Sequence, residues 1–151
     1  MSPSDRPAEG ALPEQISADL CIIGAGSGGL SLAAGTAQLG LNVVLIERGR
    51  MGGDCLNYGC VPSKALLAAG KRAHLMRTSA PFGVQSVNPQ VDFHRVNAHV
   101  HEVIAAIAPN DSVERFTGLG VKVIEAAASF VDKGTVRAGD TLVKARHFCI
   151  A

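Results

Sequence analysis

Short apolar runs and longer stretches of helical spacing alternate along the first part of the chain. Residues 18–24 form an apolar run that ends in a glycine, and residues 43–47 form a second one; both are typical of buried parallel strands. Between them, residues 28–40 carry small and apolar side chains at helical spacing and end in a glycine that can stop a helix. The order strand, helix, strand predicts an α/β fold with a parallel sheet.

Two longer helices are predicted in the middle of the chain. A continuous helical pattern runs from about Cys60 to about Thr78 and is followed by a loop-rich segment, residues 79–90. Residues 91–107 form an amphipathic pattern that the next proline interrupts, and residues 110–116 are expected to add a short helical continuation.

The last part of the chain predicts short strands. Residues 121–124 and 146–151 are apolar strands, and residues 126–144 suggest a small antiparallel meander with turns at 132–134 and 138–140. The expected architecture is a doubly wound, Rossmann-like α/β layer fold. It has a parallel sheet with helices on one face and a three-stranded antiparallel meander on the other.

Length and composition fit one ordinary domain or a large piece of one. The 151 residues are 47% hydrophobic, which is enough for a real core. Residues 1–17 are expected to be a disordered lead, since the first fifteen contain three prolines and mixed charge without the apolar stretch of a signal peptide. Residues 18–151 are expected to be the N-terminal portion of one larger domain, and the final strand suggests a fragment.

Charge and cysteine usage narrow the class of protein. The net charge of +1, with no basic stripe, argues against a nucleic-acid partner. No run of about 18 apolar residues is present, so we expect no membrane span. The expected location is a reduced cytoplasm, where the four cysteines favour catalysis or metal binding over a structural disulfide framework.

A glycine-rich turn lies directly between the first predicted strand and the first predicted helix. Gly24, Gly26 and Gly29 form Gly-x-Gly-x-x-Gly, and Ser27 and Gly28 complete the turn. The first glycine suits a tight turn, the second lets the backbone approach a pyrophosphate, and the third lets the helix pack closely on the strand. The helix N-terminus would face the phosphates. The turn predicts a dinucleotide site, with a purely structural glycine turn as the alternative.

Glu47 ends the second predicted strand about 20 residues past the glycines, where an acidic residue binds ribose hydroxyls. A solvated charge at the strand end is the alternative for this residue. Arg48 can contact cofactor phosphates or lie on the surface. The glycine pattern does not distinguish NAD from FAD, because both cofactors use it.

Cys55 and Cys60 stand five residues apart before the long predicted helix. On a regular helix their Cα atoms would lie roughly 8–9 Å apart, whereas a disulfide needs about 4.4–6.8 Å. The two thiols can therefore pair only if the turn departs from regular helix, which Asn57 and Gly59 tolerate. A redox-active dithiol at a helix N-terminus is the favoured interpretation; a metal site or two inert buried thiols are the alternatives. A dithiol that exchanges electrons with a cofactor ring favours a flavin.

The remaining cysteines and the histidines are not assigned to a site. Cys21 and Cys149 lie inside apolar strands and are expected to be inert core residues. His99 and His101 do not share a helix face, so we expect no metal pair there. The other three histidines are isolated in the sequence.

The glycine-rich turn and the segment with Cys55 and Cys60 together resemble the pyridine nucleotide-disulfide oxidoreductases. This group includes dihydrolipoamide dehydrogenase, glutathione reductase and mercuric reductase. The resemblance rests on Gly-Ala-Gly-Ser-Gly-Gly at residues 24–29 and on Gly-Gly-Asp-Cys-Leu-Asn-Tyr-Gly-Cys-Val-Pro-Ser-Lys at residues 52–64. It covers nearly the whole chain from Asp19 onward, and the dihydrolipoamide dehydrogenase or mercuric reductase type fits best. It implies that residues 18–151 are the N-terminal portion of a Rossmann-like FAD-binding domain. It also implies FAD as the cofactor and NAD(H) or NADP(H) as the electron partner.

The resemblance also implies roles for individual residues. Cys55 matches the interchange thiol, Cys60 the flavin-side thiol, and Lys64 a lysine near the reactive flavin nitrogen. The cofactor-binding positions that it implies are Gly24, Gly26, Ser27, Gly28, Gly29, Glu47, Arg48, Gly52, Gly53, Asp54, Cys55, Cys60, Lys64 and Ala128.

The chain departs from the family pattern at Asp54, where threonine is common, and at Tyr58, often a valine. A carboxylate at Asp54 changes the hydrogen bonding to the cofactor and is expected to oppose thiolate formation at Cys55. The nicotinamide-binding domain, the second flavin-binding segment and the dimerisation domain with its His-Glu pair have no counterpart in these 151 residues.

The function that the resemblance implies is electron transfer between a nicotinamide, FAD and a Cys55–Cys60 disulfide. The substrate would be a small disulfide or dithiol, or a metal ion, and the intact enzyme type would be a homodimer. The 151-residue chain alone is expected to lack turnover. The alternatives are a stand-alone FAD- or nucleotide-binding module and an inert truncation product.

Overall fold

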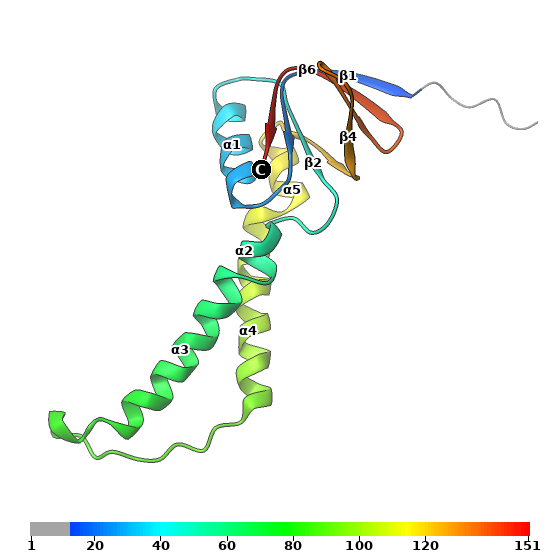
Figure 1. Ribbon diagram of the computed structural model, residues 1–151. Helices are drawn as coiled ribbons and strands as arrows, with labels where there is room; N and C mark the ends of the chain where they lie inside the picture. Colours follow the sequence, from blue (N-terminus) through cyan, green and yellow to red (C-terminus); the bar gives the residue numbers. More distant parts are fainter. Residues whose placement is uncertain (1–12) are drawn as a thin grey trace, which may run out of the picture.

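The computed structural model describes residues 13–151, which build one mixed six-stranded sheet in the order β3-β2-β1-β6-β5-β4 (Figure 1). The strands are β1 (Glu14–Ile23), β2 (Val43–Glu47), β3 (Lys122–Glu125), β4 (Ala128–Asp132), β5 (Thr135–Ala138) and β6 (Thr141–Ile150). β1 runs parallel to β2 and β6, and β2 runs parallel to β3. The α/β class and the parallel sheet predicted from the sequence are confirmed.

The helices follow the predicted pattern within a few residues at most boundaries. They are α1 (Ser27–Gln38), α2 (Gly53–Asn57), α3 (Cys60–Arg77), η1 (Ala80–Phe82), α4 (Phe93–Ile107), η2 (Ala108–Asp111) and α5 (Val113–Gly118). The proline after α4 lies at the start of the 3₁₀ turn η2, where it interrupts the regular helix. The side chain of Ser112 accepts a hydrogen bond from Arg115 N (3.2 Å) and caps α5.

The first strand is longer than the sequence pattern suggested. β1 begins at Glu14, and Glu14–Ser17 pair in register with Thr141–Lys144 of β6. The prediction of a disordered lead over residues 1–17 is therefore wrong for residues 14–17, because backbone pairing with a distant strand orders a segment of mixed polarity. The rest of that lead, up to residue 12, lies outside the described residues.

The third strand of the meander and the last strand are one continuous strand, β6. β5 pairs antiparallel with β4 and with the first half of β6, while β6 also pairs with β1 along its length. The sequence pattern placed a boundary near residue 145, but the strand passes through it without a break. The meander is thus joined to the parallel sheet by hydrogen bonds through β6.

The two faces of the sheet bury separate sets of apolar side chains. Ile22 and Leu45 face α1 and α5 and form one core with Leu30, Ala33 and Phe116. The residues that alternate with these along β1 and β2 face the meander. The core on this second face contains Ala18, Cys21, Val44, Ile46, Val136, Ala138 and Val143. This alternation follows from the two-residue period of strands. The meander therefore covers the face opposite the helices, as predicted.

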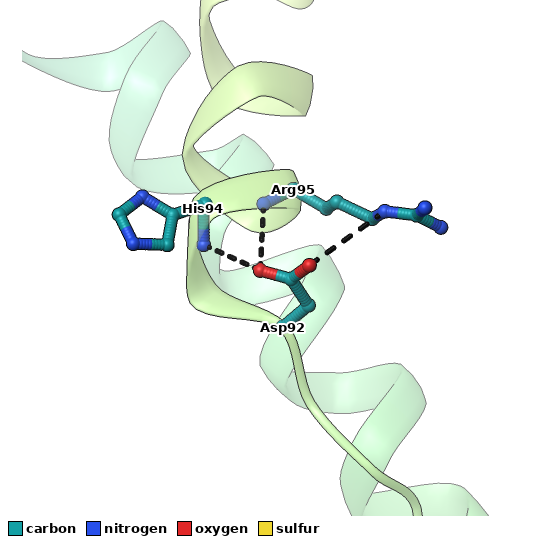
Figure 2. Close-up of polar contacts among 3 residues, drawn as sticks. All are labelled: Asp92, His94 and Arg95. Atoms are coloured by element: carbon teal, nitrogen blue, oxygen red, sulfur yellow. Dashed lines mark hydrogen bonds and ion pairs between the residues drawn. The ribbon is translucent and has the colours of Figure 1, made fainter.

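α3 and α4 contact each other and extend away from the sheet as a pair (Figure 1). Asp92 starts α4 as its N-cap: its Oδ1 accepts hydrogen bonds from His94 N at 3.0 Å and Arg95 N at 3.3 Å (Figure 2). The other oxygen lies 3.6 Å from Arg95 Nε. These contacts satisfy backbone donors that the first helical turn leaves free.

Within residues 13–151, no helix combines the length and the apolar character that crossing a membrane requires.

Candidate dinucleotide and dithiol site

The glycine-rich turn joins the end of β1 to the start of α1. Gly24 has a φ of 110° and donates its N–H to Ile46 O at 2.8 Å. A side chain at this position would collide with the backbone oxygen of Ala151, which lies directly beside the turn. Only glycine fits both the left-handed conformation and the close approach.

The other two glycines of the motif serve different purposes. A Cβ on Gly29 would collide with Gly24 O, so the absence of a side chain lets α1 pack against the turn. At Gly26 a Cβ would meet no atom within 4 Å, so the backbone there faces open space. Gly26 is also the N-cap of α1 and supplies no side-chain cap, and the first turn of the helix holds no acidic residue. The free N–H groups of this turn are suited to an anion.

Glu47 is tied to the glycine-rich turn. Its Oε2 accepts a hydrogen bond from Ala25 N at 2.6 Å, and its Oε1 accepts one from Gly49 N at 2.6 Å. The carboxylate therefore holds the end of β2 against the turn after β1. Each oxygen keeps acceptor capacity for a further donor.

A cleft of about 560 Å³ opens at this edge of the sheet. It brings together seven of the residues predicted from the sequence: Gly24, Gly26, Glu47, Arg48, Gly53, Asp54 and Ala128. The remaining walls come from residues at the ends of β1, β2 and β6 and from the segment before β4. The predicted residues that do not line this cleft are Ser27, Gly28, Gly29, Gly52, Cys55, Cys60 and Lys64.

The short helix α2 is docked on the glycine-rich turn. Gly52, at φ 84°, donates its N–H to Ala25 O at 3.0 Å. A Cβ on Gly53 would lie 2.8 Å from Gly26 Cα, so these two backbones touch without side chains between them. The Asn57 side chain stabilises the helix by donating to Met51 O (3.1 Å) and to Gly53 O (2.8 Å). Sequence reasoning missed this structural role of Asn57.

The two cysteines lie on either side of a break between helices. α2 ends at Asn57 and α3 begins at Cys60, as the required departure from regular helix predicted. Gly59 N donates to Asp54 O at 2.6 Å, and a Cβ on Gly59 would lie 3.5 Å from Cys55 Cα. The missing side chain thus allows the two helices to meet closely.

Both thiols are free; Cys55 is half-buried and Cys60 is exposed. A hydrogen bond with the Cys60 side chain raises the pKa of Cys55, as do its partial burial and the nearby Cys60 charge. The Cys60 backbone and the Lys64 ammonium act in the opposite direction on this pKa. Asp54 is not among the groups that shift it. The expectation that Asp54 opposes thiolate formation is therefore not met; this residue lines the cleft at the glycine-rich turn.

A second cavity, of about 380 Å³, lies between α1, α2 and α5. Cys55 lines it together with Ser27 and Gly52, two other residues that the sequence predicted. Its further polar lining comes from Ser31, Asp111 and Arg115, which the sequence analysis missed. No motif marks these residues. Asp111 and Arg115 lie more than fifty positions from Cys55 in the sequence, and only the folding of the chain brings them to the same cavity.

The other cysteines lie in the sheet. Cys21 is completely buried, and burial raises its pKa to about 11. Cys149 is partly buried and packs against the core beneath α1. Among the described residues, no group of three His, Cys, Asp or Glu side chains is arranged to hold a metal ion.

Fold and site together define a class of protein: an α/β fold with a glycine-rich turn between its first strand and helix, and two cysteines on successive helices, the first of which is docked against that turn. The residues present fit a dinucleotide. An open backbone at Gly26, an uncapped helix N-terminus and a cleft of adequate size meet at one edge of the sheet.

Comparison with known proteins identifies the family. A model of the family described as pyridine nucleotide-disulphide oxidoreductase matches residues 18–151. The dihydrolipoyl dehydrogenase of Geobacillus stearothermophilus is 37% identical over 123 residues, which are 81% of this chain and 26% of that protein. The mercuric reductase of Streptomyces lividans is 33% identical over 139 residues, 88% of this chain and 29% of that protein.

A solved structure has a similar fold. The Cu(II) complex of the HOCl-induced flavoprotein disulfide reductase RclA from Escherichia coli superposes with a TM-score of 0.69 and 25% identity. The match covers 87% of this chain and 27% of that one. The chain belongs to the pyridine nucleotide-disulphide oxidoreductase family, and it spans about a quarter of the length of these relatives.

Proposed function

We propose that this chain holds the cofactor turn and the dithiol of an FAD-dependent dithiol/disulfide oxidoreductase of the dihydrolipoamide dehydrogenase or mercuric reductase type. The observation that carries the proposal is the docking of α2 on the glycine-rich turn through the Gly52 N–Ala25 O hydrogen bond of 3.0 Å. This contact connects the nucleotide cleft to the helix that carries Cys55. Membership of the family supports the same function.

The cleft and the N-terminus of α1 beside it would supply the binding groups for FAD. Gly26 and the N-terminus of α1, with the N–H groups of Ser27, Gly28 and Gly29, would hold the diphosphate. Glu47 would accept hydrogen bonds from the adenosine ribose, and the Ala128 segment would lie against the adenine. Arg48, exposed at the rim, would contribute positive charge near the phosphates. When bound, FAD would pass an electron pair from NADH or NADPH to the disulfide formed by the two cysteines.

The dithiol exchanges with the substrate through the second cavity. In the reductive direction, the Cys55 thiolate attacks one sulfur of a substrate disulfide; the substrate S–S bond breaks, and the other sulfur leaves as a thiolate that takes its proton from solvent. The Cys60 thiolate then attacks the Cys55 sulfur, which forms the Cys55–Cys60 disulfide and releases the second substrate thiol. Lys64, one turn beyond Cys60 on α3, favours the thiolate form of Cys55 electrostatically.

The partners of the intact enzyme type follow from the same proposal. The substrate would be a small-molecule disulfide or dithiol, or a metal ion, and the electron partner would be a nicotinamide nucleotide. The intact enzyme would be a homodimer in the cytoplasm. We expect the 151-residue chain to show no turnover with NADH or NADPH alone. A binding module without redox chemistry remains the competing function.

An absorbance titration tests the proposal. The purified chain is mixed with FAD, freed of excess cofactor, and reduced with one equivalent of dithionite. We expect a retained flavin and a long-wavelength absorbance band from thiolate-to-flavin charge transfer, and we expect Cys60→Ser to abolish the band while retaining the flavin. A folded chain that retains no flavin contradicts the proposal. Flavin retention without the band would instead support the binding-module alternative.

A further inference from the structure

Asp54 is one of two positions, with Tyr58, at which the chain departs from the family pattern, and it lines the nucleotide cleft beside Gly26 and Gly53. No hydrogen bond or ion pair within residues 13–151 engages its carboxylate. The other carboxylate of the cleft, Glu47, is in contrast held by two backbone N–H groups at 2.6 Å. Asp54 is therefore an exposed acceptor that is available to a ligand.

The chemistry of a carboxylate restricts what Asp54 can bind. An ionised carboxylate only accepts hydrogen bonds, and so do the oxygens of a diphosphate. Asp54 therefore cannot replace a threonine hydroxyl as a donor to the diphosphate. The groups of a dinucleotide that can donate to it are the hydroxyls of its sugars.

The position of Asp54 selects one of those sugars. Glu47 and Arg48 line the cleft at the end of β2. Asp54 lies on α2, next to the diphosphate turn at Gly26 and one residue before Cys55. A dinucleotide whose diphosphate lies over Gly26 and whose redox ring reaches the dithiol must carry its second sugar past α2.

We propose that Asp54 binds the hydroxyl groups of the sugar that joins the diphosphate to the redox ring of the dinucleotide. This inference rests on the proposed function, because it takes the cleft to be the dinucleotide site. It assigns to Asp54 a role in cofactor recognition and none in activating the thiols. The groups that shift the pKa of Cys55 agree with this division, since they are Cys60, Lys64 and burial.

Isothermal titration of the full 151-residue chain with FAD and with ADP tests this assignment, because ADP has the diphosphate but no second sugar. We expect Asp54→Ala to weaken FAD binding about tenfold or more, as the loss of a hydrogen bond to a charged group does. Binding of ADP should stay within about twofold of the wild-type value or become tighter. Asp54→Asn keeps one acceptor oxygen and should give an intermediate loss for FAD.

Glu102→Ala is the matched control, because it removes an exposed acid from α4 that does not line the cleft. It should leave both affinities unchanged, and circular dichroism should show that every variant is folded. Tighter binding of both ligands by Asp54→Ala would overturn the inference and identify Asp54 as a repulsive charge. An equal loss for both would also overturn it. A wild-type chain that binds no FAD would refute the proposed function itself, and the inference with it.

Discussion

At the scale of single residues, one carboxylate organises the edge of the sheet where the site lies. The two oxygens of Glu47 bind Ala25 N and Gly49 N, which belong to different loops. Because both donors are backbone groups of short turns, the carboxylate orders the cleft without requiring a ligand. Such charge-assisted hydrogen bonds are stronger than neutral ones.

Alkylation of the cysteines by iodoacetamide should separate the thiols by environment. In the folded chain we expect Cys21 to remain unlabelled up to about pH 10, because it is buried and its pKa is raised to about 11. Labelling of Cys55 should increase with pH around a midpoint above that of a free thiol, because Cys60 and burial raise its pKa. Mass spectrometry of digested samples measures both rates.

Two variants test the causes of the raised pKa at Cys55. Cys60→Ser removes the thiol whose hydrogen bond and charge raise it, so the midpoint for Cys55 labelling should move to lower pH. Lys64→Met removes the cation that lowers it, so the midpoint should move to higher pH. Shifts in the same direction for both variants would contradict this assignment.

At the scale of elements, the site depends on how closely α1 and α2 approach the turn after β1. Both approaches occur through glycines: Gly29 against Gly24, and Gly53 against Gly26. At the break between α2 and α3 a Cβ on Gly59 would lie 3.0 Å from Asp54 O, a contact tighter than most side chains make. Backbone contacts of this kind leave no room for a methyl group.

Two glycines of α1 provide a matched test. Gly29→Ala places a Cβ against Gly24 O, so we expect a loss of about 1–3 kcal/mol in the free energy of unfolding. Gly35→Ala, two turns along the same helix, meets no atom within 4 Å and should stabilise the chain by about 0.5–1 kcal/mol. Urea denaturation followed by circular dichroism measures both changes. A similar effect of the two substitutions would show that helix propensity dominates over packing.

At the scale of the whole molecule, the sheet carries a core on each face and the α3–α4 pair extends beyond it (Figure 1). β1 and β6 occupy the centre of the sheet and contribute residues to both faces. Phe116 of α5 links the first core to the site, because it packs with Ile22 and Leu45 and also lines the cavity at Cys55.

Phe116→Ala should lower the free energy of unfolding by about 3–5 kcal/mol, because the side chain is almost fully buried and leaves a cavity. Phe93→Ala, at a position 68% exposed, should change it by less than about 1 kcal/mol. Chemical denaturation of both variants measures the difference. A small loss for Phe116→Ala would mean that α5 contributes little to the stability of the sheet.

Much of the fold and part of the site could be predicted from the sequence, because they depend on local patterns. The period of apolar residues located β2 and α3 within one residue. The glycine motif and the cysteine spacing located the turn after β1 and the break between α2 and α3, and the family is confirmed. The order in Glu14–Ser17 could not be predicted, because it depends on pairing with a strand more than 120 positions away.

By itself, the sequence determined the α/β class, the glycine-rich turn between a strand and a helix, the break in the helix between the two cysteines and the family, since each depends on residues close together in the chain. The tertiary structure decided that the third strand of the meander continues as the last strand, in β6, and that Asp111 and Arg115 lie in the cavity of Cys55. It also decided that Asp54 lines the cleft at the glycine-rich turn. The physical reason is the same in each case: long-range backbone pairing and the docking of one helix on a distant turn leave no periodic signal in the sequence.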